Sequence, residues 1–327
     1  MKSLLYFAVI LIYSVGISHK ADGQVKLHTE DLPHFYEAFD SVMTTKDTLK
    51  QADFVQKLYV DKASVGLKEF MELRGGSTQT WRKFIEDNKS SLIEKRPWIL
   101  SVLSQETEIR NRIALFKKYY PDFRDGDIYF CVGIGNSGGT IRDRTVYIGT
   151  EVAAGSTPNW AVYLVLHEFA HTQQWVQRNI NSLNQNEKLG QEYERTHQNL
   201  LGKCLEEGMA DFVAELVLGQ QLSVVNPDGY IAFGLKHEQT IWIQYQKEMN
   251  QKFDYDKGWL YAEKTIDDKR MKDLGYFVGY QICKSFYNKV KDKKQALNYM
   301  LGLNLTDENS KNFLLLSRYK VQRKHGQ

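Results

Sequence analysis

The chain has 327 residues, of which 42% are hydrophobic and 13% aromatic, which is ample for a packed core in one large domain or two smaller ones. Its 43 lysines and arginines nearly balance its 40 aspartates and glutamates. This balance gives no strong field that would attract a polyanion, so we expect no nucleic-acid partner.

The N-terminus has the pattern of a secretory signal. Lys2 gives a positive start, and residues 4–17 carry no charge and are too few for a comfortable membrane span. Candidate cleavage sites follow Ser18 and Gly23. We therefore predict a signal peptide over residues 1–23 and an exported protein that is periplasmic, in the cell envelope or secreted. The alternative is an uncleaved anchor, and we expect membrane contact only through this segment.

Residues 24–125 are predicted to form a helical N-terminal region. Apolar residues recur there at helical spacing, and Pro97 and Pro121 mark predicted breaks. No group of residues in this region suggests chemistry.

From residue 126 the pattern changes to short strands. Residues 128–132 and 145–148 predict two strands, joined by a glycine-rich hairpin loop and a charged turn. Residues 133–138 also fit the G-x-G-x-x-G spacing of dinucleotide-binding loops. An extended run follows them instead of a helix, which argues against a dinucleotide oxidoreductase.

The most informative stretch is H-E-F-A-H at residues 167–171, inside a run that is apolar on every side. Burying ionisable groups without compensation costs several kcal/mol, and a divalent metal supplies that compensation directly. His167 and His171 are one helical turn apart and can bind one zinc ion, while Glu168 is placed to take a proton from a metal-bound water. Residues 156–158 predict the helix start. The alternative is a pair of core histidines hydrogen-bonded to the backbone or to each other.

A second buried helix, predicted to end at Gly219, supplies the missing ligand. Glu207 and Asp211 lie one turn apart on it and would repel each other unless each had its own partner. We predict that Glu207 binds the zinc and that Asp211 accepts the free ring N–H of His167. Glu206 competes for the ligand role, but adjacent helical residues diverge by about 100°.

The three cysteines, Cys131, Cys204 and Cys283, are widely spaced and predict neither a disulfide framework nor a structural zinc site. Their apolar surroundings predict buried free thiols. Cys204 stands one turn before Glu207 and could lean towards the metal.

The two metal motifs, at residues 167–171 and 207–211, together resemble the gluzincin pattern of thermolysin-like peptidases. They are also similar to bacterial predicted zinc proteases of the peptidase-MA type, some of them linked to gliding-motility lipoproteins. The resemblance covers residues 126–290 and implies a zinc metallopeptidase with Glu168 as general base and a peptide or protein substrate. It also implies an edge strand at residues 145–150, to which an extended peptide could add. The chain departs from thermolysin in having Glu206 in place of asparagine and in a longer gap between the helices.

The same resemblance implies a tyrosine or histidine in the C-terminal part that stabilises an oxyanion. Tyr276 and Tyr280 are the best candidates because they share one face of a predicted helix with glycines beside them. His237 is a weaker candidate, and His197 is expected at the surface. Tyrosines on helices are also common as packing residues.

We therefore expect a mostly helical α+β protein with a small β-sheet before the metal helix. A zincin-like catalytic domain is expected over residues 126–290 and a C-terminal helical segment over 291–327. The expected function is hydrolysis of peptide bonds by a zinc-activated water. The alternative is a non-catalytic exported metal-binding envelope protein or partner-binding module. Glu168 favours the enzyme, because a structural site has no use for a general base.

Overall fold

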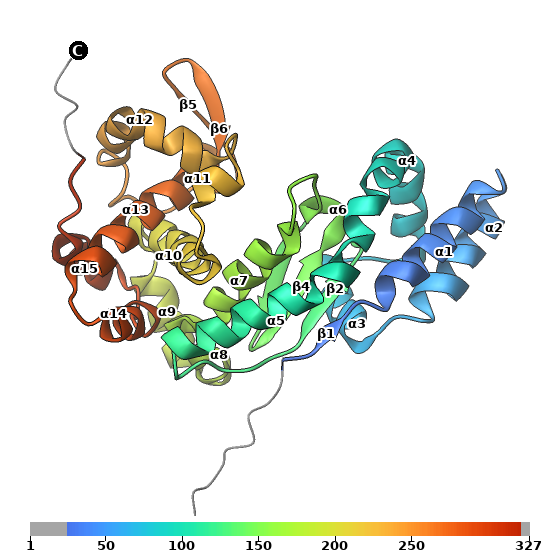
Figure 1. Ribbon diagram of the computed structural model, residues 1–327, viewed down its shortest axis with the longest axis horizontal. Coiled ribbons are helices and arrows are strands. Elements are labelled where there is room, and N and C mark those ends of the chain that lie inside the picture. The colour runs from blue at the N-terminus through green and yellow to red at the C-terminus, as the bar shows by residue number, and fades with distance from the viewer. Residues whose placement is uncertain (1–24, 322–327) are drawn as a thin grey trace, which may run out of the picture.

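The computed structural model describes residues 25–321 and shows the mostly helical α+β fold that the sequence predicts. The predicted signal peptide lies outside the described residues. A small sheet lies between an N-terminal group of helices and a larger C-terminal group (Figure 1). Among the described residues, no helix is both long enough and apolar enough to cross a bilayer.

The N-terminal helices occupy most of the region that the sequence predicts to be helical. They are α1 (Asp31–Met43), α2 (Thr48–Val55), the π-helical turn η1 (Gln56–Val60), α3 (Val65–Arg74), α4 (Thr78–Leu100) and α5 (Val102–Tyr119). Pro121 follows the end of α5, as predicted. Pro97 does not end α4 at the predicted position, since the helix continues from Pro97 to Leu100 without the hydrogen bond that the proline cannot donate. The backbone departs from helical geometry at Asn88 instead.

The main sheet has the strand order β1-β2-β4-β3. Its strands are β1 (Leu27–His28), β2 (Ile128–Cys131), β3 (Gly139–Arg142) and β4 (Thr145–Gly149). The predicted hairpin between residues 128–132 and 145–148 is wrong, because β2 and β4 run parallel. The glycine-rich loop instead leads into β3, which forms the antiparallel hairpin with β4. The edge strands are therefore β1 and β3, and β4, where an edge strand was expected, is internal.

The C-terminal part is a group of helices with one projecting hairpin. The helices are α6 (Thr150–Ala153), α7 (Trp160–Gln173), α8 (Trp175–Gln185), α9 (Glu187–Thr196), α10 (Leu200–Leu218), α11 (Leu222–Val225), α12 (Tyr230–Tyr245), η2 (Tyr255–Lys257), α13 (Leu274–Lys289), α14 (Lys293–Leu301) and α15 (Asp307–Ser317), and the hairpin is β5 (Glu263–Ile266) with β6 (Lys269–Lys272). The predicted start of the metal helix at residues 156–158 is wrong, since α7 begins after Asn159, whose φ is 56°. Helix α10 ends at Gly219 with φ 69°, as predicted.

Helices α10 and α13 pack backbone to backbone. A Cβ atom on Gly279 would lie 1.8 Å from the carbonyl oxygen of Cys204, and one on Gly208 would lie 2.1 Å from the backbone nitrogen of Tyr280. Only glycine permits so close an approach. Buried apolar residues from both helix groups and the sheet form one cluster, so the proposed division into regions stays a prediction.

Candidate metal centre

The structure brings His167, His171 and Glu207 together. The histidines lie one turn apart on α7, and Glu207 reaches them from α10. Nε2 of His171 is 3.1 Å from Nε2 of His167 and 3.2 Å from Oε2 of Glu207. The distance from His167 Nε2 to the same oxygen is 3.7 Å. Three potential ligand atoms therefore converge on one point.

These three distances fit a tetrahedral zinc ion. Zinc binds imidazole nitrogen and carboxylate oxygen at about 2.0–2.1 Å, which places its tetrahedral ligand atoms about 3.3 Å apart. The separations of 3.1, 3.2 and 3.7 Å bracket that value. Two imidazoles and one carboxylate are also a donor set that zinc accepts.

The other ring nitrogens face hydrogen-bond acceptors. Nδ1 of His167 lies 2.8 Å from Oδ1 of Asp211, and Nδ1 of His171 lies 3.0 Å from Oε1 of Gln174. In the tautomer that satisfies these acceptors, Nδ1 carries the proton and the lone pair of each Nε2 faces the other ligand atoms. A cation at the centre of the cluster would then be bound by both lone pairs and by the carboxylate of Glu207.

The pKa shifts of the two histidines and of Glu207 indicate that the cluster favours positive charge. Burial alone would lower the pKa of His171, but the carboxylate of Glu207 outweighs burial and raises it to about 9. His167 follows the same balance, since hydrogen bonds to Asp211 and Glu207 raise its pKa above its ordinary value. Burial would raise the pKa of Glu207, but the histidines hold it well below its usual range. A metal ion would therefore compete with protons for this cluster.

Asp211 is fully buried and has three partners. In addition to His167, it accepts hydrogen bonds from the hydroxyls of Tyr163 at 2.6 Å and Tyr230 at 2.9 Å. These bonds compensate its charge and orient the carboxylate towards the ring of His167. The sequence analysis did not find Tyr230, which comes from α12 and has no spacing relation to either motif.

Two tyrosines lie near Glu207, and a third, which the sequence analysis expected there, does not. Tyr261, in the loop before β5, donates a hydrogen bond to Oε1 of Glu207 at 2.6 Å. Tyr276 lines the same pocket, with its ring 6.1 Å from that of His167. Tyr280 does not join this group, because its hydroxyl donates to Glu215 at 2.6 Å. The structure thus brings Tyr276 to the cluster, places Tyr280 elsewhere, and adds Tyr261, which the sequence analysis missed.

Glu168 is buried beside the cluster. It borders a pocket of about 240 Å³ with both histidines and Glu207, and the pocket wall also includes Arg74. Burial raises the pKa of Glu168 above its ordinary value. A Cβ atom on Gly139 of β3 would lie 2.1 Å from its Oε1, so a glycine is required at the edge strand for this approach.

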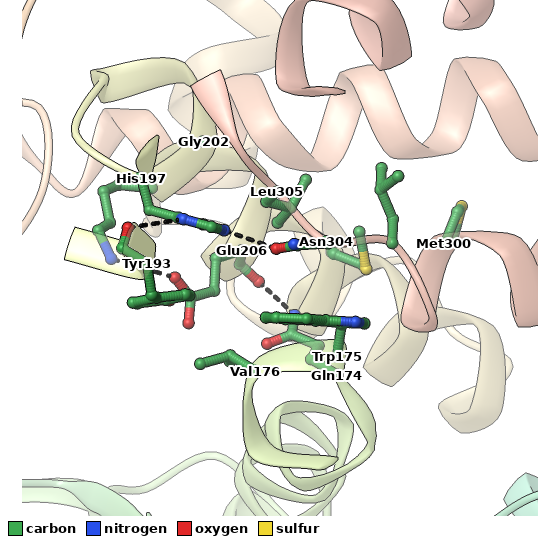
Figure 2. A pocket seen from close by; sticks show the side chains of 13 residues that line it. Gln174, Trp175, Val176, Tyr193, His197, Gly202, Glu206, Met300, Asn304 and Leu305 are labelled. Atoms are coloured by element: carbon green, nitrogen blue, oxygen red, sulfur yellow. Dashed lines mark hydrogen bonds and ion pairs between the residues drawn. The ribbon is translucent and has the colours of Figure 1, made fainter. Parts of the chain in front are cut away.

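Glu206 lines both this pocket and a neighbouring one, which Figure 2 shows. Its carboxylate lies 3.6 Å from Lys203, and its backbone carbonyl accepts a hydrogen bond from Gln174. His197 lines the same pocket, where its ring stacks on Tyr193 at 3.9 Å, so it is partly covered and not a free surface residue.

The remaining candidates lie outside the metal cluster. His237 contacts Asp267 of the projecting hairpin at 2.7 Å. All three cysteines are free and buried, as predicted. Burial raises the pKa of the Cys204 thiol to about 12, and this thiol is not among the ligand atoms that converge.

The fold and this cluster define a mostly helical α+β protein with a buried pair of histidines and a carboxylate arranged as a metal centre. A family model described as "Gliding motility protein GldB" matches residues 20–321, and the chain belongs to this family. No match was found among curated proteins or among solved structures.

Family membership corrects the expected activity. The matching family is one of gliding motility proteins and not of zinc peptidases, so the gluzincin assignment, the peptidase function, and the description as a hydrolase and protease are wrong. The physical reason is that H-E-x-x-H fixes how a helix presents two ligands and a carboxylate, but not whether a substrate reacts there. The family also speaks against a peptide substrate. The assignment of Glu168, Tyr276 and Tyr280 as site residues is not tested by the family match and stays a prediction.

The family also bears on location. Gliding motility proteins of this family belong to the cell envelope, which agrees with the exported or envelope-associated location that the sequence predicts.

Proposed function

We propose that this chain is a non-catalytic protein of the bacterial cell envelope that holds a zinc ion and supports gliding motility by binding a partner protein. The family match over residues 20–321 is the observation that carries this proposal. The predicted signal peptide supports export, and the family match supports the cell envelope as the location.

Zinc would be held by His167, His171 and Glu207 and would join α7 to α10. The supporting hydrogen bonds extend this connection further, since Tyr230 of α12 donates to Asp211 and Tyr261 donates to Glu207. A metal at this position links four segments that are distant in sequence. Its contribution in this proposal is mechanical, because it stabilises the surfaces that these segments present.

The pocket beside the cluster is the proposed contact region for the partner. It has a volume of about 240 Å³ and a mostly polar lining that includes Arg74, Gln177 and Tyr261. The same pocket borders His167, His171 and Glu207, and a zinc ion held by these three residues would have one tetrahedral position without a protein donor. Partner binding should therefore depend on the metal.

The first experiment separates metal binding from catalysis. His171→Ala removes a ligand and should lower the zinc content of the purified protein from about one equivalent to a small fraction. Glu168→Gln is the matched variant on the same helix and should retain zinc. Equal zinc content in the wild type and in His171→Ala would contradict the metal centre.

The second experiment uses both variants in the source bacterium. Cells that carry Glu168→Gln in place of the wild-type gene should glide, and cells that carry His171→Ala should lose gliding. A tagged wild-type protein should also retain its partner in a pull-down that zinc chelation weakens. Loss of gliding in Glu168→Gln, with folding and zinc content intact, would contradict a non-catalytic role.

A further inference from the structure

A strongly basic surface lies at the C-terminal end of the fold. Residues 284–294 and 311–320 hold eight lysines and arginines and a single aspartate, whereas the other charged residues of the chain are acidic in excess. Figure 1 shows α14 and α15 at one end of the molecule, far from α1 and α2. We call this surface the basic end, and it consists of Lys289, Lys291, Lys293, Lys294, Arg318 and Lys320.

Direct contacts bring the two segments of the basic end together. Nζ of Lys289, at the end of α13, donates to the carbonyl oxygens of Ser317 at 2.7 Å and Arg318 at 2.8 Å. The end of α13 therefore meets the end of α15. Burial, with the positive charges of Arg318 and Lys320, lowers the pKa of Lys289, so these cations are close enough to repel one another. Such crowding favours an anionic partner.

Two large apolar side chains lie beside these cations. Leu315 is 74% exposed and Leu316 is 54% exposed, both in the last turn of α15 just before Arg318. Single exposed leucines are common on protein surfaces, but an adjacent pair next to a cluster of lysines combines the two features of interfacial membrane binding.

The geometry points to an anionic lipid bilayer as the occupant of the basic end. Lysine and arginine side chains would contact lipid phosphates, while Leu315 and Leu316 would enter the headgroup region. A nucleic acid is less suitable, because the leucines would gain nothing from it. The sequence analysis expected membrane contact only through the N-terminal segment, and the folded chain offers this second contact. The inference does not depend on the metal centre.

Vesicle sedimentation tests this inference. The form of the protein to be tested starts at residue 24. It retains every described residue and lacks the apolar run at residues 4–17. It should bind vesicles that contain phosphatidylglycerol, should bind pure phosphatidylcholine vesicles weakly, and should lose binding in high salt. The triple variant Lys291→Glu, Lys294→Glu, Lys320→Glu should bind at least about a hundredfold more weakly. Leu315→Ser with Leu316→Ser should reduce binding about tenfold.

The matched controls lie on the N-terminal helices and in the segment between α1 and α2, at the other end of the molecule. Lys46, Lys50 and Lys68 are exposed and make no ion pair in the described structure, and Leu49 is 79% exposed. Replacing these three lysines with glutamate, or Leu49 with serine, should leave vesicle binding unchanged. The inference is overturned if the wild type does not bind anionic vesicles, if it binds phosphatidylcholine equally well, or if both charge-reversal variants bind alike. Because zinc content is a separate readout, such a result would leave the metal centre intact.

Discussion

The hydroxyl of Tyr261 donates a hydrogen bond to Oε1 of Glu207 at 2.6 Å, while Oε2 of the same carboxylate faces His171 at 3.2 Å. Each oxygen of Glu207 therefore has its own partner. Because the phenol holds Oε1, the carboxylate is fixed in the orientation that presents Oε2 to the histidines.

Replacing Tyr261 with phenylalanine should weaken zinc binding about tenfold, since loss of an outer hydrogen bond typically costs this much affinity at a metal site. Competition titration with a chromophoric chelator measures the change. Tyr255→Phe is the control, because that ring lies 5.8 Å from the ring of Tyr261 and makes no hydrogen bond in the described structure. Equal zinc affinity in both variants would show that the Tyr261 hydroxyl has no such role.

Asp211→Asn should weaken zinc binding by about ten- to a hundredfold. An amide lacks the negative charge that strengthens the Nδ1–H donation of His167, and it offers one acceptor atom to the three donors that Asp211 now satisfies. Zinc should then raise the melting temperature of the variant less than that of the wild type. Asp228→Asn makes the same chemical change at an exposed position and should change neither quantity. A wild-type zinc response in Asp211→Asn would refute the prediction.

Helical spacing explains which parts of the cluster could be predicted. His167 and His171, like Glu207 and Asp211, stand four residues apart, so each pair shares a helix face whatever the rest of the chain does. Tyr230 and Tyr261 reach the cluster from α12 and from a loop, and only the tertiary fold brings them there. A single sequence contains no local signal for such contacts.

The errors in the sheet have a similar origin. Strand β1 has two residues and pairs with β2 about a hundred positions away, so no periodicity marks it. Strand β3 begins at Gly139 in the glycine-rich loop, and its composition conceals a strand. Whether the site is catalytic was the least predictable property. His167, His171, Glu207 and Asp211 suit a reactive metal and a structural metal equally well.

The contact between α10 and α13 should tolerate no side chain at Gly279. A methyl group there would overlap the carbonyl oxygen of Cys204, which is backbone and cannot move aside cheaply. Gly279→Ala should therefore lower the free energy of unfolding by at least about 3 kcal/mol, measured by urea denaturation. A Cβ atom on Gly155 would have no neighbour within 4 Å, so Gly155→Ala should change stability by less than about 0.5 kcal/mol. Similar unfolding midpoints in the two variants would contradict this packing.

The final prediction concerns Glu151, a buried carboxyl group on α6. Its oxygens accept hydrogen bonds from the backbone N–H groups of Gly133 at 2.8 Å and Gly135 at 3.0 Å. Burial raises its pKa above the ordinary 4.5, and these bonds offset burial only in part. The pKa of Glu151 is higher in the folded chain than in the unfolded chain, so the folded state favours the protonated carboxyl group. This contribution to stability is fully present below about pH 4.5 and is lost as the pH rises through the pKa of the folded state.

Glu151→Gln should remove that part of the pH dependence. The amide oxygen accepts from one of the two N–H groups, so the free energy of unfolding of the variant should be about 1–3 kcal/mol lower at every pH. The test therefore compares how steeply this free energy changes with pH in the two proteins, and not its absolute value. Urea unfolding from about pH 4 to 8, with a chelator present throughout, should give a stability that falls less steeply with pH in the variant than in the wild type. Exposed Glu94→Gln should reproduce the wild-type slope. Parallel curves for Glu151→Gln and the wild type would mean that this carboxyl group titrates alike in the folded and unfolded chain.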